Sequence, residues 1–269
     1  MARWILFPYP QRYQYEPDSL ARQWPHLHQG DMEPVPTEAP VLAAWVAFHN
    51  GQFQQAREAG LAAGCAGFTV ANLATVVYAR YLEKRERARQ ELFLEAAERA
   101  QGQLQAEPDN PNAWYCHGLA LQHYSQGISV AKALAQGIGN KVKHSLERAI
   151  ALAPDHADAR VALGAFHAEV IDKVGPLIGG MTYGAKKDVA LRLFQEALQL
   201  HPTSALAHTE YANALVMLEG DVRMAEATTL YEQAAHSNPL DAVQYLAAEM
   251  AQTELATEDC SRDWPITSR

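Results

Sequence analysis

The chain has 269 residues, of which 48% are hydrophobic and 20% are charged, an ordinary composition that excludes bulk disorder. Its formal net charge is −9, and its strongest basic run, residues 84–89, is mixed with glutamates, so the charge argues against a nucleic-acid-binding surface. Cys65, Cys116 and Cys260 form no Cys-x-x-Cys pair and indicate a reducing compartment. The apolar run before Pro8 is too short for a signal peptide, and no stretch of about 18 apolar residues could cross a membrane. We expect a soluble, cytoplasmic protein.

Residues 1–36 do not repeat any other part of the chain. They place six aromatic residues among six prolines: Trp4, Phe7, Tyr9, Tyr13, Tyr15 and Trp24. Prolines interrupt regular structure, and large aromatic side chains need a surface to cover them. We therefore predict an extended N-terminal arm that docks on the chain's own helices.

From residue 37 onward, amphipathic runs end repeatedly at a proline. Pro108, Pro154, Pro202 and Pro239 follow one another at intervals of 46, 48 and 37 residues. Each of the last three is preceded by a small or medium residue, a bulky residue four positions later and an alanine three positions after that. These triplets are Val142, Leu146 and Ala149; Ala190, Phe194 and Ala197; and Ala227, Tyr231 and Ala234. Small residues, Gly118, Gly164 and Ala212, occupy a matching place in the preceding run, where they would let two helices approach closely.

This pattern resembles the tetratricopeptide repeat, a pair of antiparallel helices that stacks on its neighbours. A looser unit covers about residues 37–70, another first helix covers about 71–81, and a final helix covers about 242–255. The resemblance implies an all-α solenoid of about five helical hairpins over residues 37–258, closed by a C-terminal capping helix. Residues 259–269 are expected to form a tail.

Two of the steps between prolines are about a dozen residues longer than the usual 34. The extra residues lie near 123–141 and 168–187, are apolar and rich in glycine, and are expected to form loops that cover something. With these enlarged units, residues 111–239 resemble the family that joins the T component of bacterial TRAP transporters with the regulators of microtubule dynamics, most visibly at residues 145–154. In the transporter branch, that resemblance implies a channel for an apolar ligand.

The tetratricopeptide resemblance also implies which residues face a partner, because the first helices of the hairpins line the concave side. The candidate binding residues are Trp45, Phe48, Asn72, Thr75, Asn112, Tyr115, Leu119, Gln122, Val161, Thr209 and Asn213. No Lys or Arg falls on these positions, so the basic clamp that some relatives use for a terminal carboxylate is missing. The set suits an apolar or neutral protein segment. The alternative is that the arm or the insertions fill this face.

Motifs for catalysis or metal binding are not evident. The run Gly179–Lys186 lacks the spacing of a phosphate loop, and the eleven histidines form no ligand pair with metal-site spacing. We expect no enzyme activity, no cofactor, no metal and no nucleic-acid partner. The leading hypothesis is a binding or scaffold protein that holds a protein segment in the concave groove. The alternative is a small apolar ligand in a channel lined by the inserted segments.

Overall fold

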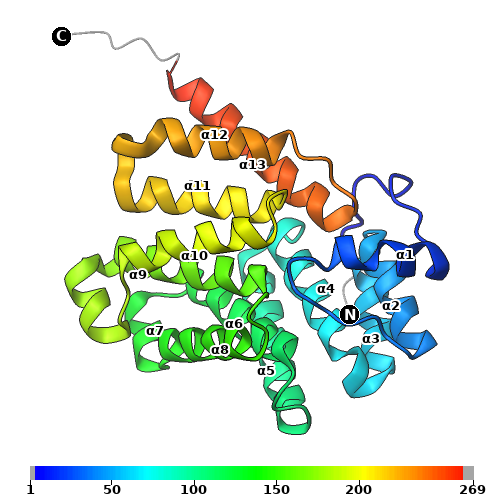
Figure 1. Cartoon of the computed structure of the whole chain (residues 1–269). Coiled ribbons are helices and arrows are strands. Elements are labelled where there is room, and N and C mark those ends of the chain that lie inside the picture. The colour runs from blue at the N-terminus through cyan, green and yellow to red at the C-terminus, as the bar shows by residue number, and fades with distance from the viewer. Residues whose placement is uncertain (1–3, 263–269) are drawn as a thin grey trace.

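The computed structural model describes the backbone of residues 4–262 and the side chains of residues 4–256. Within that range the chain forms thirteen α-helices and two short 3-10 turns and contains no strand (Figure 1). Five antiparallel hairpins follow one another along the chain, which confirms the all-α solenoid. Their helices are α2 (Ala39–His49) with α3 (Phe53–Ala62), α4 (Phe68–Tyr81) with α5 (Glu86–Ala106), α6 (Pro111–Gln126) with α8 (Ile138–Leu152), α9 (Ala157–Tyr183) with α10 (Lys187–Leu200), and α11 (Ala205–Glu219) with α12 (Met224–Ala235).

Side-chain caps fix the starts of three repeat helices, α6, α9 and α11. Asn110 Oδ1 accepts from the Ala113 amide at 3.0 Å, and Pro111 occupies the first turn of α6, where its missing amide hydrogen costs nothing. Ser204 caps α11 in the same way, by accepting from the Ala207 amide at 3.1 Å. The prolines that divide the sequence therefore lie between helices or at their first positions.

The small residues of the repeats lie where two helices of a hairpin touch. A Cβ atom on Gly118 would lie 2.8 Å from Cγ of Leu146, and one on Gly164 would lie 2.9 Å from Cε2 of Phe194. Both distances are too short for real carbon contacts. These two glycines therefore set the spacing inside the α6/α8 and α9/α10 hairpins.

The N-terminal arm differs from the extended segment predicted. Residues 17–27 form a helix, α1 (Pro17–Leu27), which has Pro17 at its first position and a reciprocal cap between Glu16 and Ser19. The prediction treated the prolines of this segment as interruptions of regular structure, but Pro17 occupies the first turn, where a proline supports a helix. The arm docks on the chain's own solenoid: Trp4 stacks on Tyr78 with ring centroids 4.0 Å apart, and Phe7 is 3% exposed.

The last helix, α13 (Ala242–Arg262), returns to the beginning of the chain. In Figure 1 its first turns lie beside the blue N-terminal helices, so the solenoid closes on itself. Tyr13 Oη donates to the Pro239 carbonyl at 3.1 Å, and Tyr15 Oη donates to the Leu240 carbonyl at 2.8 Å. The helix runs four residues past the predicted end of the solenoid at 258, and residues 263–269 of the predicted tail lie outside the described range.

The two insertions are helical rather than loops. The first contains a short helix, α7 (Val130–Ala135), and the second continues α9 past a kink at Gly175, whose φ is 80°. Glycine adopts this positive φ at little cost, and Pro176 restarts the helix. The side chains of Leu177, Ile178 and Met181 are 74%, 58% and 82% exposed, so the prediction that these apolar insertions are buried covers was wrong for them.

No helix in residues 4–262 is both long enough and apolar enough to span a bilayer.

Candidate binding site

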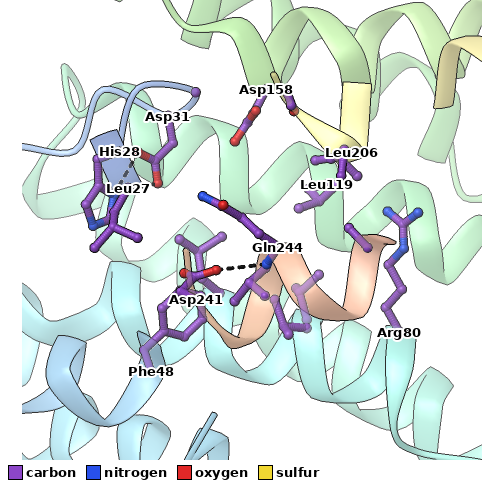
Figure 2. A pocket seen from close by; sticks show the side chains of 18 of the residues that line it. Leu27, His28, Asp31, Phe48, Arg80, Leu119, Asp158, Leu206, Asp241 and Gln244 are labelled. Carbon is purple, nitrogen blue, oxygen red and sulfur yellow. Dashed lines mark hydrogen bonds and ion pairs between the residues drawn. The ribbon is translucent and has the colours of Figure 1, made fainter. Parts of the chain in front are cut away.

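Closure of the solenoid leaves a pocket of about 140 Å³ on the concave side, here called the central pocket. Figure 2 shows that the N-terminal segment, α4, α11 and α13 all contribute side chains to it. Its apolar wall consists of Leu27, Phe48, Leu73, Val76, Val77, Tyr81, Tyr115, Leu119, Leu206 and Val243. An apolar cavity of about 150 Å³ accepts a benzene ring, so the central pocket has room for one aromatic or branched apolar group.

Asp158, at the start of α9, contributes a carboxyl group to the wall of the central pocket. Burial, together with the smaller effect of the nearby Asp31 carboxylate, raises the pKa of this carboxyl to about 7. The Asp158 amide donates to the Gly30 carbonyl at 3.0 Å, and a methyl group on Gly30 would overlap with the Asp158 carboxyl. Among the described residues, none hydrogen-bonds to that carboxyl. Near neutral pH it can therefore either donate to or accept from a group that enters the pocket.

Arg80 places a cation in the lining where the sequence pattern predicted none. Its guanidinium forms an ion pair with Glu210 that joins α4 to α11 across 130 residues of sequence. The candidate positions followed the ideal repeat pattern, and Arg80 is not among them. The charge of Arg80 is neutralised by Glu210, so the pocket still lacks a free basic clamp.

A buried chain of four side chains forms another part of the wall of the central pocket. His28 Nδ1 lies 2.9 Å from Asp31 Oδ1, His28 Nε2 lies 3.2 Å from His49 Nε2, and His49 Nδ1 lies 2.6 Å from Asp241 Oδ2. We call this set the His–Asp chain. The contact between the two Nε2 atoms requires a proton on one of them, and each Nδ1 faces a carboxylate that can accept from it.

All four members of the His–Asp chain are buried. Burial lowers the pKa of His49, and the Asp241 carboxylate opposes this effect. Burial also acts to raise the pKa of Asp31, but the charge and hydrogen bond of His28 outweigh it and the pKa is lowered. Because its members come from the arm, α2 and the start of α13, the His–Asp chain holds both ends of the protein together at the pocket.

Five of the predicted binding residues come together here. Phe48, Tyr115 and Leu119 line the central pocket, and a narrow extension of about 30 Å³ adds Gln122 and Val161 to Tyr115 and Leu119. The two neighbouring hollows share Tyr115 and Leu119 in their walls.

The other six predicted residues are not available to a partner through the central pocket. Trp45 is 1% exposed and contacts the rings of Trp24 and His49. The five polar residues satisfy groups of the chain itself: Asn72 accepts from Arg99, Thr75 donates to the Ala71 carbonyl, Asn112 donates to Glu33, Thr209 donates to the Ala205 carbonyl, and Asn213 accepts from Tyr231. Of these five, Asn112 is held by the N-terminal segment through Glu33, and the other four are bonded within their own hairpins.

A second hollow, here called the insertion pocket, has a volume of about 320 Å³ and lies between the two inserted segments. Its wall is mainly apolar and consists of Ile128, Val130, Ala133, Val142, Phe166, Val170, Val174 and Tyr183. Glu169 and Lys173 also line it, and burial raises the pKa of Glu169 to about 7. The insertions thus form a separate apolar site.

The described histidines do not assemble a metal centre. In the part of the chain with described side chains, no group of three or more His, Cys, Asp or Glu residues is placed to hold a metal. Burial lowers the pKa of one set of histidines to about 4: His117, His123, His156 and His167. These rings are therefore neutral at physiological pH and belong to the packed interior.

Comparison with known proteins agrees with this architecture. The family model described as regulator of microtubule dynamics protein 1-3 matches residues 65–173, which overlaps the predicted resemblance at 111–239 up to residue 173. No curated protein matches the chain. The crystal structure of a thermophilic TPR protein from Thermus thermophilus superposes with a TM-score of 0.57 at 14% identity and covers 80% of this chain and 97% of its own. The chain is therefore a tetratricopeptide-like α-solenoid, in which residues 65–173 are similar to the regulators of microtubule dynamics.

Proposed function

We propose that this protein is a non-enzymatic binding protein that holds a segment of a protein partner by one apolar side chain inserted into the central pocket. The observation that supports this proposal most is an apolar hollow of about 140 Å³ that remains on a concave face otherwise filled by the chain itself. Tetratricopeptide-like folds commonly act as protein-interaction scaffolds, and the fold alone does not identify a partner.

The size of the pocket limits what can enter it. A peptide bound along an open groove would need the space that α13 and the arm occupy, whereas one ring or branched chain fits without moving either. Asp158, which can donate or accept near neutral pH, could then meet a backbone group of the inserted segment. Such an anchor in a desolvated pocket commonly carries most of the affinity of an interface.

The cellular setting in this proposal is the cytoplasm. Cys65 and Cys116 are free thiols, which suits a reducing compartment. The net charge of −9 also supports a protein partner over nucleic acid.

A displayed peptide library tests the proposal. Selected peptides should share one Phe, Leu or Ile, and replacement of that residue by Ser should abolish binding measured by fluorescence anisotropy. Leu119→Trp fills the central pocket and should weaken binding at least about tenfold, the scale of a lost anchor residue. The matched control, Leu94→Trp, changes a surface residue of α5 outside the central pocket and should bind as the wild type does. Equal binding by both variants would contradict the proposal.

A second candidate function rests on the insertion pocket. Its volume of about 320 Å³ and its apolar wall suit a small apolar molecule, which matches the channel implied by the transporter branch of the resemblance. Native mass spectrometry of the purified protein should then show an added mass that Ala133→Trp removes and Ala131→Trp, on the exposed side of α7, retains. A single apo mass for the wild type would count against this candidate.

A further inference from the structure

The two insertions end in an exposed apolar surface. Leu177, Ile178 and Met181 lie within one helical stripe of the second half of α9, where they are 74%, 58% and 82% exposed. On α7, Val130 and Leu134 are one turn apart and 47% and 54% exposed. We call these five residues the insertion tip. Apolar side chains gathered in this way on a protein surface usually mark a contact with a membrane or a partner.

The two parts of the insertion tip flank one hollow. Val130 and Ala133 of α7 line the insertion pocket together with Val174 and Tyr183 of α9. A Cβ atom on Gly139, just after α7, would lie 2.6 Å from the Tyr183 ring, so the two insertions touch. Figure 1 shows α7 and the far end of α9 at the same end of the molecule.

The lysines of the chain gather at the same end. Six of its seven lysines lie between residues 132 and 187, although the whole chain carries a net charge of −9: Lys132, Lys141, Lys143, Lys173, Lys186 and Lys187. Lys143 pairs with Glu147 at 3.5 Å and Lys187 with Glu219 at 2.6 Å. The other four are exposed and form no ion pair with any described residue. Segments 123–141 and 168–187 together hold five of these lysines against two acidic residues, Glu169 and Asp172, so the insertions carry a net positive charge in a chain whose net charge is −9.

Taken together, the geometry points to a peripheral membrane contact: we propose that the insertion tip docks on an anionic phospholipid bilayer. The five side chains of the tip are largely exposed to solvent, which suits shallow insertion among lipid headgroups. Neither inserted segment, 123–141 or 168–187, contains an arginine. Lysine is a mobile point charge that suits a fluid surface of phosphates, whereas arginine is preferred for fixed bidentate recognition of a carboxylate. The lysines draw the tip to the bilayer and the apolar side chains enter it.

Flotation with vesicles tests this proposal. The wild type should float with vesicles of phosphatidylcholine and phosphatidylserine in equal parts and should not float with phosphatidylcholine alone. Each basic residue near such a surface strengthens binding by roughly fivefold at low salt, so the triple variant Lys132→Gln, Lys141→Gln, Lys186→Gln should lose roughly a hundredfold in partition coefficient. The control variant Arg22→Gln, Lys84→Gln, Arg87→Gln removes the same charge from exposed positions elsewhere and should float like the wild type, apart from a small uniform loss.

A second pair of variants tests the apolar half of the contact. Leu177→Ser with Met181→Ser should reduce binding at least about tenfold, because both side chains leave water on docking. Val222→Ser, which changes an 86% exposed apolar residue of the turn between α11 and α12, should have no effect.

Several results would overturn the proposal. The first is that the wild type does not float with the anionic vesicles at low salt. The second is that the test and control variants lose vesicle binding to the same extent. Binding to soluble polyglutamate, or lysine-dependent dimerisation, in the absence of vesicle binding would also overturn it and would assign the tip to an acidic protein or to a second copy. None of these results depends on the central pocket, so the proposed function is tested separately.

Discussion

His49 Nδ1 and Asp241 Oδ2 lie 2.6 Å apart although 192 residues separate them in the sequence. This buried pair joins the first hairpin to the start of the last helix, and Asp241 also caps that helix by accepting from the Gln244 amide at 2.8 Å. One carboxylate thus serves both the helix start and the closure of the solenoid.

Replacing Asp241 by Asn should weaken the contact between the first hairpin and α13. The carboxylate uses one oxygen to cap α13 and the other to face His49 Nδ1, whereas the amide has a single oxygen for both contacts. We expect Asp241→Asn to lower the free energy of unfolding by about 2–4 kcal/mol. Hydrogen exchange should also accelerate in α13 and in residues 7–15. Unchanged exchange in both segments would show that the pair does not hold the ends together.

The close contact at Gly164 makes a second test. Gly164→Ala forces a methyl group against the Phe194 ring and should cost about 1–3 kcal/mol. Gly102 lies in α5 with nothing within 4 Å of its missing Cβ, so Gly102→Ala should stabilise the protein by up to about 1 kcal/mol through helix propensity. Chemical denaturation compares the two, and a stabilising Gly164→Ala would contradict the packing of the α9/α10 hairpin.

Arg80 and Glu210 should show strong coupling. Removing one partner leaves the other charge buried, so Arg80→Met should cost about 3–5 kcal/mol. Adding Glu210→Met removes the uncompensated charge and should restore most of that loss. A double variant as unstable as the sum of the single variants would mean that the ion pair does not act as a unit.

Stability should be highest near pH 6.5. Burial raises the pKa of three acids, Glu33 to about 8 and Asp158 and Glu169 to about 7. They keep their protons in the folded state while the unfolded chain loses them, so their contribution falls as pH rises to about 8. Burial lowers the pKa of four histidines from 6.5 to about 4, so their contribution is lost as pH falls from 6.5.

The histidines outnumber the acids below pH 6.5 and should dominate there. Each of the fully buried rings, His123 and His156, should contribute a slope of about 1.4 kcal/mol per pH unit. Urea unfolding across a series from about pH 5 to about pH 8 checks this expectation. A stability that rises steadily through that whole range would contradict the neutral, buried state of these acids.

The helical repeats could be predicted because they follow local rules. The positions of Gly118 and Gly164 follow from their spacing to the next proline, and the structure places both at helix contacts. Closure could not be predicted, because nothing near Asp241 in the sequence indicates that its partner is His49. The partner of Asn112 could not be predicted for the same reason, because Glu33 belongs to the docked N-terminal segment, which an ideal repeat does not contain.

The central claim is that the central pocket receives an apolar side chain of a protein partner. Intermolecular nuclear Overhauser effects between a selected peptide with a single phenylalanine and the methyl groups of the protein test it most directly. We expect the phenylalanine ring to contact the methyl groups of Leu119 and Leu206 in the central pocket. Contacts only with Val142 and Val170 of the insertion pocket, or with neither pair, would contradict the claim.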